Sequence, residues 1–596
     1  MALNGVNLAL VPAAAEAAWA AIYRRLGLSD DDLERQFTGP AFLAWLRMGN
    51  VRGWGGPLPD SWHRRQRNLQ LAVTDYMLRL GMVPVLPAFA GHVPSALPGL
   101  YPNATFYRVN SWNKFGQNYC CALYLDPRDP LFKKLGRLFL EELTRNSGLG
   151  HVYTADPFNE VQFEGMTTDL VRAAAIAIVA AMRTVDDDAV WLLQNWMFVH
   201  DPLDWSLERV RALLEAPPPG RLLMLDLQAE QWPQYNLYDM YYGRPFIWCM
   251  LHNFGGTLGM FGDMARINRD VYAARVATNS TMIGIGLTPE GIYQNYVVYE
   301  MMLESAWRTR PIADLDAWTA DYASRRYGCD ATAGAWRYLL RSVYGSHGSN
   351  RVRGKYTVTR RPSLRLRPWA WYASYDLMAA WRGFVYATTK CRSLGFEHDL
   401  VDITRQALQY RADQLYLGVR RAVDADPWAL NVTSLRFLDA LEDMHKMLET
   451  NYAFSAADWL EGARAAASDH DEAFLYETNA RYQITLWGPN GEVEDYACKQ
   501  WAEVLQHYYI PRWRAFLQAA VTAEARGARF DERAVQDAVR ASVETAFLSV
   551  NIDFAGSGDA PTVARQLYEK WAFVPGLDEL PPGLAPWRSL HATATL

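Results

Sequence analysis

Two glutamates in this 596-residue chain stand where a polar loop follows an apolar run, a position from which a carboxyl group can do acid–base or nucleophilic chemistry. The first closes the segment Asp156-Pro157-Phe158-Asn159-Glu160. A carboxylic acid held at such a strand end can protonate a glycosidic oxygen, so we interpret Glu160 as a general acid. Asn159 would reach the substituent on sugar carbon 2, an interaction that strengthens as the ring flattens toward an oxocarbenium ion. The alternative is a solvated loop glutamate.

The second glutamate lies in Pro289-Glu290-Gly291, between the last apolar run and a helical pattern over residues 292–307. On its own this motif is also ordinary helix capping, with an acidic side chain near the positive helix N-terminus. The place of Glu290 along the chain favours a role as the second carboxylate of a catalytic pair. If the apolar runs form a barrel, Glu160 and Glu290 leave strands on opposite sides of its mouth and flank one sugar from both faces.

Tryptophan is unusually frequent, with 23 residues in the chain. An aromatic face offers apolar area to the C–H face of a pyranose, while neighbouring polar groups meet the hydroxyls. Core packing is the alternative for any single ring. The candidates for sugar stacking are Trp45, Trp54, Trp112, Trp196 and Trp487.

The elements that position these residues alternate between apolar, β-branched runs and amphipathic helical patterns, which is typical of βα modules with parallel strands. The seven runs cover residues 6–12, 82–89, 151–158, 189–196, 222–227, 245–251 and 281–287. The helical patterns cover residues 62–80, 131–146, 168–185, 206–216 and 264–277.

A doubly wound sheet could use seven strands, but polar and aromatic residues cluster just after the strands, as in a (β/α)8 barrel, which needs eight. Residues 3–6 resemble residues 79–82, a helix end with a Gly stop that leads into a strand. We therefore predict a TIM-like (β/α)8 barrel over residues 1–310 that lacks its first strand.

From residue 311 to residue 596 long helical patterns dominate, at 400–423, 434–450, 456–479, 493–527 and 531–550, and predict a mostly α-helical C-terminal domain. Near the boundary, residues 351–368 hold six Arg and one Lys without a helical period. This segment could bind a sulfated polysaccharide. The plainer interpretation is a solvated, salt-bridged linker.

Composition argues against several classes of function. A formal net charge of −6 gives no basic surface for nucleic acid. Six cysteines in so long a chain do not make a disulfide framework, and their spacing does not predict a zinc site. We expect no membrane span, since the longest apolar stretch, residues 171–182, is too short. The first residues also lack the basic segment and cleavage site of a secretory signal.

Several longer motifs occur in both predicted domains. They are Arg47-Met48-Gly49-Asn50, Leu86-Pro87-Ala88-Phe89-Ala90-Gly91-His92-Val93-Pro94, Phe158-Asn159-Glu160, Phe246-Ile247-Trp248-Cys249-Met250-Leu251-His252-Asn253-Phe254-Gly255-Gly256, Pro289-Glu290-Gly291-Ile292 and Leu486-Trp487-Gly488-Pro489. Together these motifs resemble the α-N-acetylglucosaminidase family (glycoside hydrolase family 89), which includes a lysosomal enzyme of heparan sulfate breakdown. The resemblance extends over both predicted domains.

The resemblance implies a retaining hydrolase of glycans with a terminal α-linked N-acetylglucosamine, in which Glu160 is the acid/base and Glu290 the nucleophile. It implies no cofactor and no metal, a lysosomal or secreted location, and a site shared between the domains. The family's first barrel strand contributes an Asn and a Cys to the pocket, and we expect both to be missing here. The sequence leaves homo-oligomer formation open. The substrate-binding residues implied are Trp45, Trp112, Asn159, Trp196 and Phe254 from the barrel, with Trp487 and Tyr496 from the helical domain.

Two other functions stay open. The chain could be a carbohydrate-binding protein that keeps the aromatic pocket but turns over weakly or not at all because the first strand is absent. It could also be a metal-dependent barrel hydrolase, although its eleven His residues form no His-x-His pair.

Overall fold

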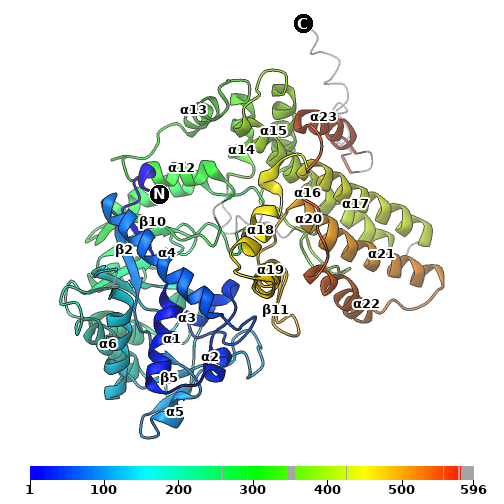
Figure 1. Ribbon diagram of the computed structural model, residues 1–596. Helices are drawn as coiled ribbons and strands as arrows, with labels where there is room; N and C mark the ends of the chain where they lie inside the picture. The colour runs from blue at the N-terminus through cyan, green and yellow to red at the C-terminus, as the bar shows by residue number, and fades with distance from the viewer. Residues whose placement is uncertain are drawn as a thin grey trace.

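The computed structural model describes residues 1–145, 147–256, 259–291, 293–345, 356–423, 426–554, 556–574 and 577–578. It has a barrel part and a helical part that lie side by side (Figure 1). The barrel part is built on a seven-stranded parallel sheet. Its strands, in chain order, are β1 (Leu8–Leu10), β2 (Val83–Pro87), β6 (Val152–Thr154), β7 (Val190–Gln194), β8 (Leu222–Asp226), β9 (Phe246–Met250) and β10 (Met282–Leu287).

The order of the strands in the sheet follows their order in the chain, β1-β2-β6-β7-β8-β9-β10. Each neighbouring pair is parallel, with registers such as Leu10 opposite Val85 and Leu287 opposite Met250. All seven apolar runs predicted from the sequence contain one of these strands. Because parallel strands in this order direct their carboxyl ends to the same side, the loops after them share one face.

Helices follow the strands and cover the sheet, and several begin at the side-chain caps that the sequence supplies. Thr167 accepts a hydrogen bond from the backbone N–H of Leu170, and Ser206 accepts one from Arg209. The helices of this part that have nine or more residues are α1 (Ala15–Leu26), α4 (Asp60–Arg79), α6 (Pro130–Thr144), α7 (Thr168–Met182), α9 (Leu207–Glu215), α11 (Met264–Val276) and α12 (Tyr296–Glu304).

A small antiparallel sheet, which the sequence did not predict, is inserted between β2 and β6. Its order is β3 (His92–Val93), β5 (Leu123–Leu125) and β4 (Phe106–Arg108). Cys120 and Cys121, just before β5, are joined by a disulfide and are buried. The loops around this sheet carry Trp112 toward the carboxyl ends of the barrel strands.

The C-terminal part is mostly helical, as predicted. In Figure 1 α16, α17 and α21 lie side by side, and α18, α19 and β11 lie between them and the barrel. Its longer elements are α13 (Leu315–Tyr327), α14 (Ala333–Arg341), α15 (Ser374–Ala387), α16 (Leu394–Ala422), α17 (Pro427–Leu448), α18 (Ala457–Ala465), α19 (His470–Ile484), α21 (Ile510–Ala525), α22 (Glu532–Val539) and α23 (Ala560–Trp571).

Three predicted helices differ from the structure. The pattern over 456–479 is two helices, because Asp469 caps a new helix by accepting from the N–H of Glu472. The pattern over 493–527 starts with β12 (Val493–Glu494), which pairs with β11 (Leu486–Trp487) in a hairpin, and its first helix begins only at residue 502. The helix after Glu290 begins at Tyr296, so Glu290 is not in its first turn. Ile292 and Asn146, which the predictions included, lie outside the described residues.

Four of the six cysteines form two disulfides, which were not predicted from the sequence. Besides the Cys120–Cys121 pair, Cys329 at the end of α13 is bonded to Cys391, which precedes α16. The sequence spacing gave no sign of this pair, because its two members come together only when α13, α15 and α16 pack. The bond therefore closes a loop inside the helical part.

The hairpin is fixed to the helical core by a buried ion network. Arg512, with 0% of its side chain exposed, lies 2.8 Å from Asp495 and 3.1 Å from Glu544. Arg361 pairs with Glu544 and Glu494. Arg361 is thus salt-bridged, as the plainer interpretation of the basic segment 351–368 predicted. Residues 351–355 of that segment lie outside the described chain. Among the residues with defined positions, no helix combines the length and apolar character needed to cross a membrane.

Candidate active site

Glu160 follows β6 and is held between two indoles. Trp112 Nε1 donates to its Oε2 over 2.5 Å, and Trp196 Nε1 donates to its Oε1 over 2.7 Å. His200 Nε2 lies 3.8 Å from the same Oε1, and 19% of the glutamate side chain stays exposed. The backbone of Glu160 is left-handed, with φ of 52°. Because such backbone is unfavourable for a residue with a Cβ, its surroundings must hold it there.

Neighbouring amides supply that support. Asn50 Nδ2 donates to the backbone oxygen of Asn159 over 3.0 Å. Gln194, at the end of β7, donates through Nε2 to Asn159 Oδ1 (2.9 Å) and to Asp156 Oδ2 (2.5 Å). Its Oε1 accepts from the N–H of Trp196. Gln194 was not predicted as a site residue. Its only signal in the sequence is that a polar residue ends an apolar run.

Asp156 is a further carboxyl group beside Glu160. Desolvation raises the pKa of Asp156 to about 7, the hydrogen bond from Gln194 opposes this rise, and the charge of Glu160 adds to it. Burial therefore favours the protonated form of the Asp156 carboxyl beside Glu160.

Glu290 follows β10 and receives two hydrogen bonds from different parts of the chain. The backbone N–H of Gly255 donates to Oε2 over 2.6 Å, and the hydroxyl of Tyr496 donates to Oε1 over 2.8 Å. Glu290 itself is exposed. Tyr496 comes from the loop after the β11–β12 hairpin, so this carboxylate is bound by both domains.

The two domains meet at Gly255 and Gly256. A Cβ added to Gly255 would lie 2.5 Å from Ala497 Cα, so only glycine allows this approach. Lys499 Nζ donates to the backbone oxygen of Gly256 over 3.1 Å. Burial lowers the pKa of Lys499 to about 8. The barrel loop thus has backbone contact with the helical domain beside Glu290.

Ring contacts join the two carboxylates into one site. Trp112, which bonds Glu160, lies 6.4 Å between ring centroids from Trp487, and Trp487 lies 5.2 Å from Tyr496, which bonds Glu290. On the other side Trp196 packs on Phe254 at 5.4 Å, next to Gly255. Glu160 and Glu290 therefore share a single aromatic surrounding.

The remaining predicted aromatic residues differ in exposure. Trp45 is partly exposed and packs at 4.5 Å from Trp487 and 6.4 Å from Tyr496. Trp487 is only 1% exposed, so it supports the rings of Trp45 and Trp112 from behind. Trp54 is 8% exposed and packs on Tyr119, so for this residue the core alternative holds and stacking on a sugar does not.

Within the described parts of the chain, no three His, Cys, Asp or Glu side chains are grouped as metal ligands would be. The carboxylates, indoles and amides of this site are groups that can donate a proton, attack carbon and bind a polar ring without a cofactor.

Comparison with known families identifies two domains. The model described as "Alpha-N-acetylglucosaminidase (NAGLU) tim-barrel domain" matches residues 1–309. The model described as "Alpha-N-acetylglucosaminidase (NAGLU) C-terminal domain" matches residues 318–570. The described part of the chain has the corresponding parallel sheet and helical part.

Individual relatives agree. The chain is 45% identical to the α-N-acetylglucosaminidase of Homo sapiens over 580 residues, which are 96% of this chain and 78% of that one. A family 89 glycoside hydrolase from Clostridium perfringens, solved with PUGNAc, superimposes with a TM-score of 0.86 at 27% identity, covering 97% of this chain and 66% of that one. A form from the same organism was solved with its substrate GlcNAc-alpha-1,4-galactose and gives a TM-score of 0.85 at 27% identity, covering 96% and 65%. This chain thus spans about two thirds of the solved bacterial chains. It belongs to the α-N-acetylglucosaminidase family.

Proposed function

We propose that this protein is a retaining glycoside hydrolase that removes terminal α-linked N-acetylglucosamine by double displacement. Glu160 is the acid/base and Glu290 the nucleophile. The observation that carries the proposal is the continuous contact from Glu160 through Trp112, Trp487 and Tyr496 to Glu290. A binding protein has no need for two carboxylates oriented in one aromatic site, and the solved relative with a bound GlcNAc-alpha-1,4-galactose supports the same substrate class.

The stereochemistry of the substrate requires a protein nucleophile. In an α-linked N-acetylglucosamine the acetamido group is cis to the leaving group and cannot attack carbon 1 from the back. Glu290 therefore attacks while Glu160 protonates the departing oxygen, and water then hydrolyses the glycosyl ester with Glu160 as the base. Retention by this route needs the two carboxyl groups roughly 5 to 5.5 Å apart around the sugar.

The sugar contacts follow from the same arrangement. Trp45, Trp112, Trp196 and Phe254 are partly exposed and offer ring faces or edges to the sugar. Tyr496 and Asn159 supply polar contacts, Asn159 toward the substituent on carbon 2. Trp487 completes the aromatic surrounding from behind. Family resemblance favours heparan sulfate as the glycan and a lysosomal or secreted location.

We further propose that the barrel lacks a strand between β1 and β10. In the described chain β1 pairs with β2 alone and β10 with β9 alone, whereas each strand of a closed barrel has two neighbours. Ile283 on β10 is 64% exposed and Leu10 on β1 is 56% exposed. Amide hydrogen exchange tests this point. Backbone amides of β10 should exchange faster than those of β8, and equal protection would argue for a closed barrel.

The activity is tested with an aryl α-N-acetylglucosaminide followed by proton NMR. The α-anomer of N-acetylglucosamine should appear first, and the rate should not change with chelators. Release of the β-anomer would indicate inversion, and loss of activity with chelators would favour the metal-dependent alternative. Binding of N-acetylglucosamine without any turnover would support the carbohydrate-binding alternative.

A further inference from the structure

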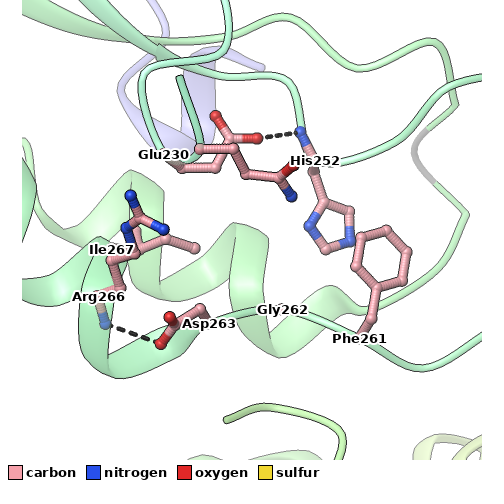
Figure 2. Close-up of a pocket in the computed structure, with 8 residues that line it drawn as sticks. Glu230, His252, Phe261, Gly262, Asp263, Arg266 and Ile267 are labelled. Atoms are coloured by element: carbon pink, nitrogen blue, oxygen red, sulfur yellow. Dashed lines mark hydrogen bonds between the residues drawn. The ribbon is translucent and has the colours of Figure 1, made fainter. Parts of the chain in front are cut away.

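The loop after β9, which bonds Glu290 through the N–H of Gly255, has an unusual backbone conformation at its start. His252 has φ of 65°, and its N–H donates to Glu230 Oε1 over 2.8 Å. The His252 imidazole stacks on Phe261 at 4.2 Å, with 5° between the ring planes. Figure 2 shows these contacts in a pocket that Asp263 and Arg266 also line. The start of this loop is thus fixed by the barrel core.

Asn253, the next residue, is fully buried, and its side-chain amide bonds the backbone of Gly291. Its Nδ2 donates to the backbone oxygen of Gly291 over 2.7 Å, and its Oδ1 accepts from the N–H of Gly291 over 3.1 Å. The amide therefore makes two hydrogen bonds that form a ring with the N–H and the C=O of one residue, Gly291. Tyr299 closes the group, since Asn253 Nδ2 also lies 2.9 Å from its hydroxyl, which donates to the same Gly291 oxygen over 3.1 Å.

Gly291 directly follows Glu290 and is packed closely against the loop after β9. A Cβ on Gly291 would lie 2.5 Å from Gly256 Cα, so the two backbones are in contact. One residue earlier, the N–H of Gly255 donates to Glu290 Oε2. The loop 253–256 thus holds Glu290 at its side chain through Gly255 and at its backbone through Asn253.

We propose that Asn253 is a positioning residue that fixes the attacking carboxylate of Glu290 through the peptide of Gly291. This inference rests on the proposed role of Glu290 as nucleophile. The amide is buried and touches the backbone, so it acts through Glu290 and not on the sugar. A shift of about 1 Å in an attacking group can lower a rate about 100-fold, which is the scale of the effect expected when the ring is lost.

The chain offers a matched control. Asn268 on α11 is 6% exposed and makes the same ring of two hydrogen bonds with the N–H and the C=O of Ile312, with both distances 2.9 Å. Ile312 lies at the start of the helical part, away from both carboxylates in the sequence and in the described contacts. Asn253→Ala and Asn268→Ala remove the same kind of interaction from equally buried sites, so a general loss of stability affects both.

The experiment compares the full chain with both variants by three measurements: kcat and KM on an aryl α-N-acetylglucosaminide, the thermal midpoint, and binding of 2-acetamido-1,2-dideoxynojirimycin and of N-acetylglucosamine. We expect Asn253→Ala to lower kcat about 100-fold with little change in KM. It should weaken the iminosugar, whose protonated nitrogen needs a placed carboxylate, far more than the neutral sugar. Asn268→Ala should lose similar thermal stability and keep kcat and both affinities.

The inference is overturned if the two variants have equal kcat, or if Asn253→Ala weakens both ligands by the same factor. Binding is measured without turnover, so the comparison does not depend on a fast enzyme. Glu290→Gln is assayed in parallel. If it keeps full turnover, the nucleophile assignment itself fails. If it is inactive while Asn253→Ala is not impaired, only the positioning role fails.

Discussion

The hydroxyl of Tyr496 donates a hydrogen bond to Oε1 of Glu290 over 2.8 Å, although 206 residues separate the two in the sequence. Tyr496 belongs to the helical domain and Glu290 to the barrel. The adjacent Asp495 has a left-handed backbone, with φ of 50°, and is held by the buried Arg512. The helical domain is therefore part of the site and completes the surroundings of Glu290.

Removing this hydroxyl should lower turnover while the fold persists. A hydrogen bond to a charged group contributes about 1.5–3 kcal/mol, so we expect Tyr496→Phe to reduce kcat by roughly 10- to 100-fold. Tyr119→Phe is the control, since the Tyr119 ring packs on Trp54 in the same aromatic region. Steady-state kinetics on an aryl α-N-acetylglucosaminide give the comparison. Equal kcat for both variants would mean that the bond to Glu290 has no catalytic importance.

The indole of Trp196 should matter for its N–H as well as for its ring. Trp196→Phe keeps an aromatic face but removes the 2.7 Å hydrogen bond to Glu160. We expect kcat/KM to fall by roughly 10- to 100-fold, more with a poor leaving group than with an activated one, because Glu160 acts on the leaving oxygen. Trp54→Phe makes the same chemical change in a ring that packs on Tyr119, and it should leave the leaving-group dependence unchanged. If kcat/KM depends on the leaving group in the same way in both variants, this would argue against the assignment of Glu160 as acid/base.

Local patterns were enough to predict the strands of the parallel sheet and the places of both carboxylates after them, but not the small antiparallel sheet. The apolar runs contain all seven strands of the parallel sheet, and Glu160 and Glu290 follow β6 and β10, as expected. Contacts between distant segments could not be read in this way. The role of Gln194 depends on Asn159, Asp156 and Trp196 meeting around it.

The helical half shows the same limit. Residues 493–501, which include β12, were predicted as the beginning of a long helix. They are not helical, because β12 pairs with β11 and because Asp495 has a positive φ and pairs with a distant arginine. Trp54 and Trp487 could be identified as aromatic but not as buried, because the rings that cover them come from both domains.

Two buried carboxyls should contribute more stability in mild acid than in base. Desolvation raises the pKa of Asp413 to about 7 and that of Asp226 to about 6. A carboxyl that binds its proton more tightly when folded stabilises fully below its unfolded pKa of about 3.9, and this stabilisation is lost as pH rises through the folded value. The contribution of these two carboxyls to the unfolding free energy should therefore fall between pH 4 and pH 8.

Asp413→Asn isolates one of these groups. The amide oxygen can still accept from the N–H of Thr357, which now lies 2.7 Å from Asp413 Oδ1, but it carries no charge. We expect the variant to be more stable than the parent at pH 8 and to show a flatter pH dependence, with each pKa unit worth about 1.4 kcal/mol. Asp187→Asn, at an exposed position, is the control. Denaturant unfolding at pH 5 and pH 8 measures the unfolding free energy of each protein. The same change with pH in the parent and in Asp413→Asn would contradict this prediction.

The Cys329–Cys391 bond should stabilise the helical domain. Its members are 62 residues apart, and closing a loop of that size restricts the unfolded chain. Replacing both with Ala should lower the unfolding free energy by about 2–4 kcal/mol. Thermal unfolding with and without reductant measures this. The parent should lose stability on reduction, and the double variant should lose less, because only the Cys120–Cys121 bond remains to be reduced. If reductant lowers the thermal midpoint of both proteins equally, the Cys329–Cys391 bond does not contribute to stability.

The central claim is that Glu290 attacks carbon 1 and Glu160 serves as acid and base, and azide rescue tests it most directly. With an activated α-N-acetylglucosaminide and azide, Glu290→Gly should form the β-glycosyl azide, because azide replaces the missing nucleophile in a single displacement. Glu160→Ala should form the α-glycosyl azide, because azide attacks the glycosyl ester on Glu290 without base assistance. The same anomer from both variants, or the two anomers exchanged, would contradict the assignment.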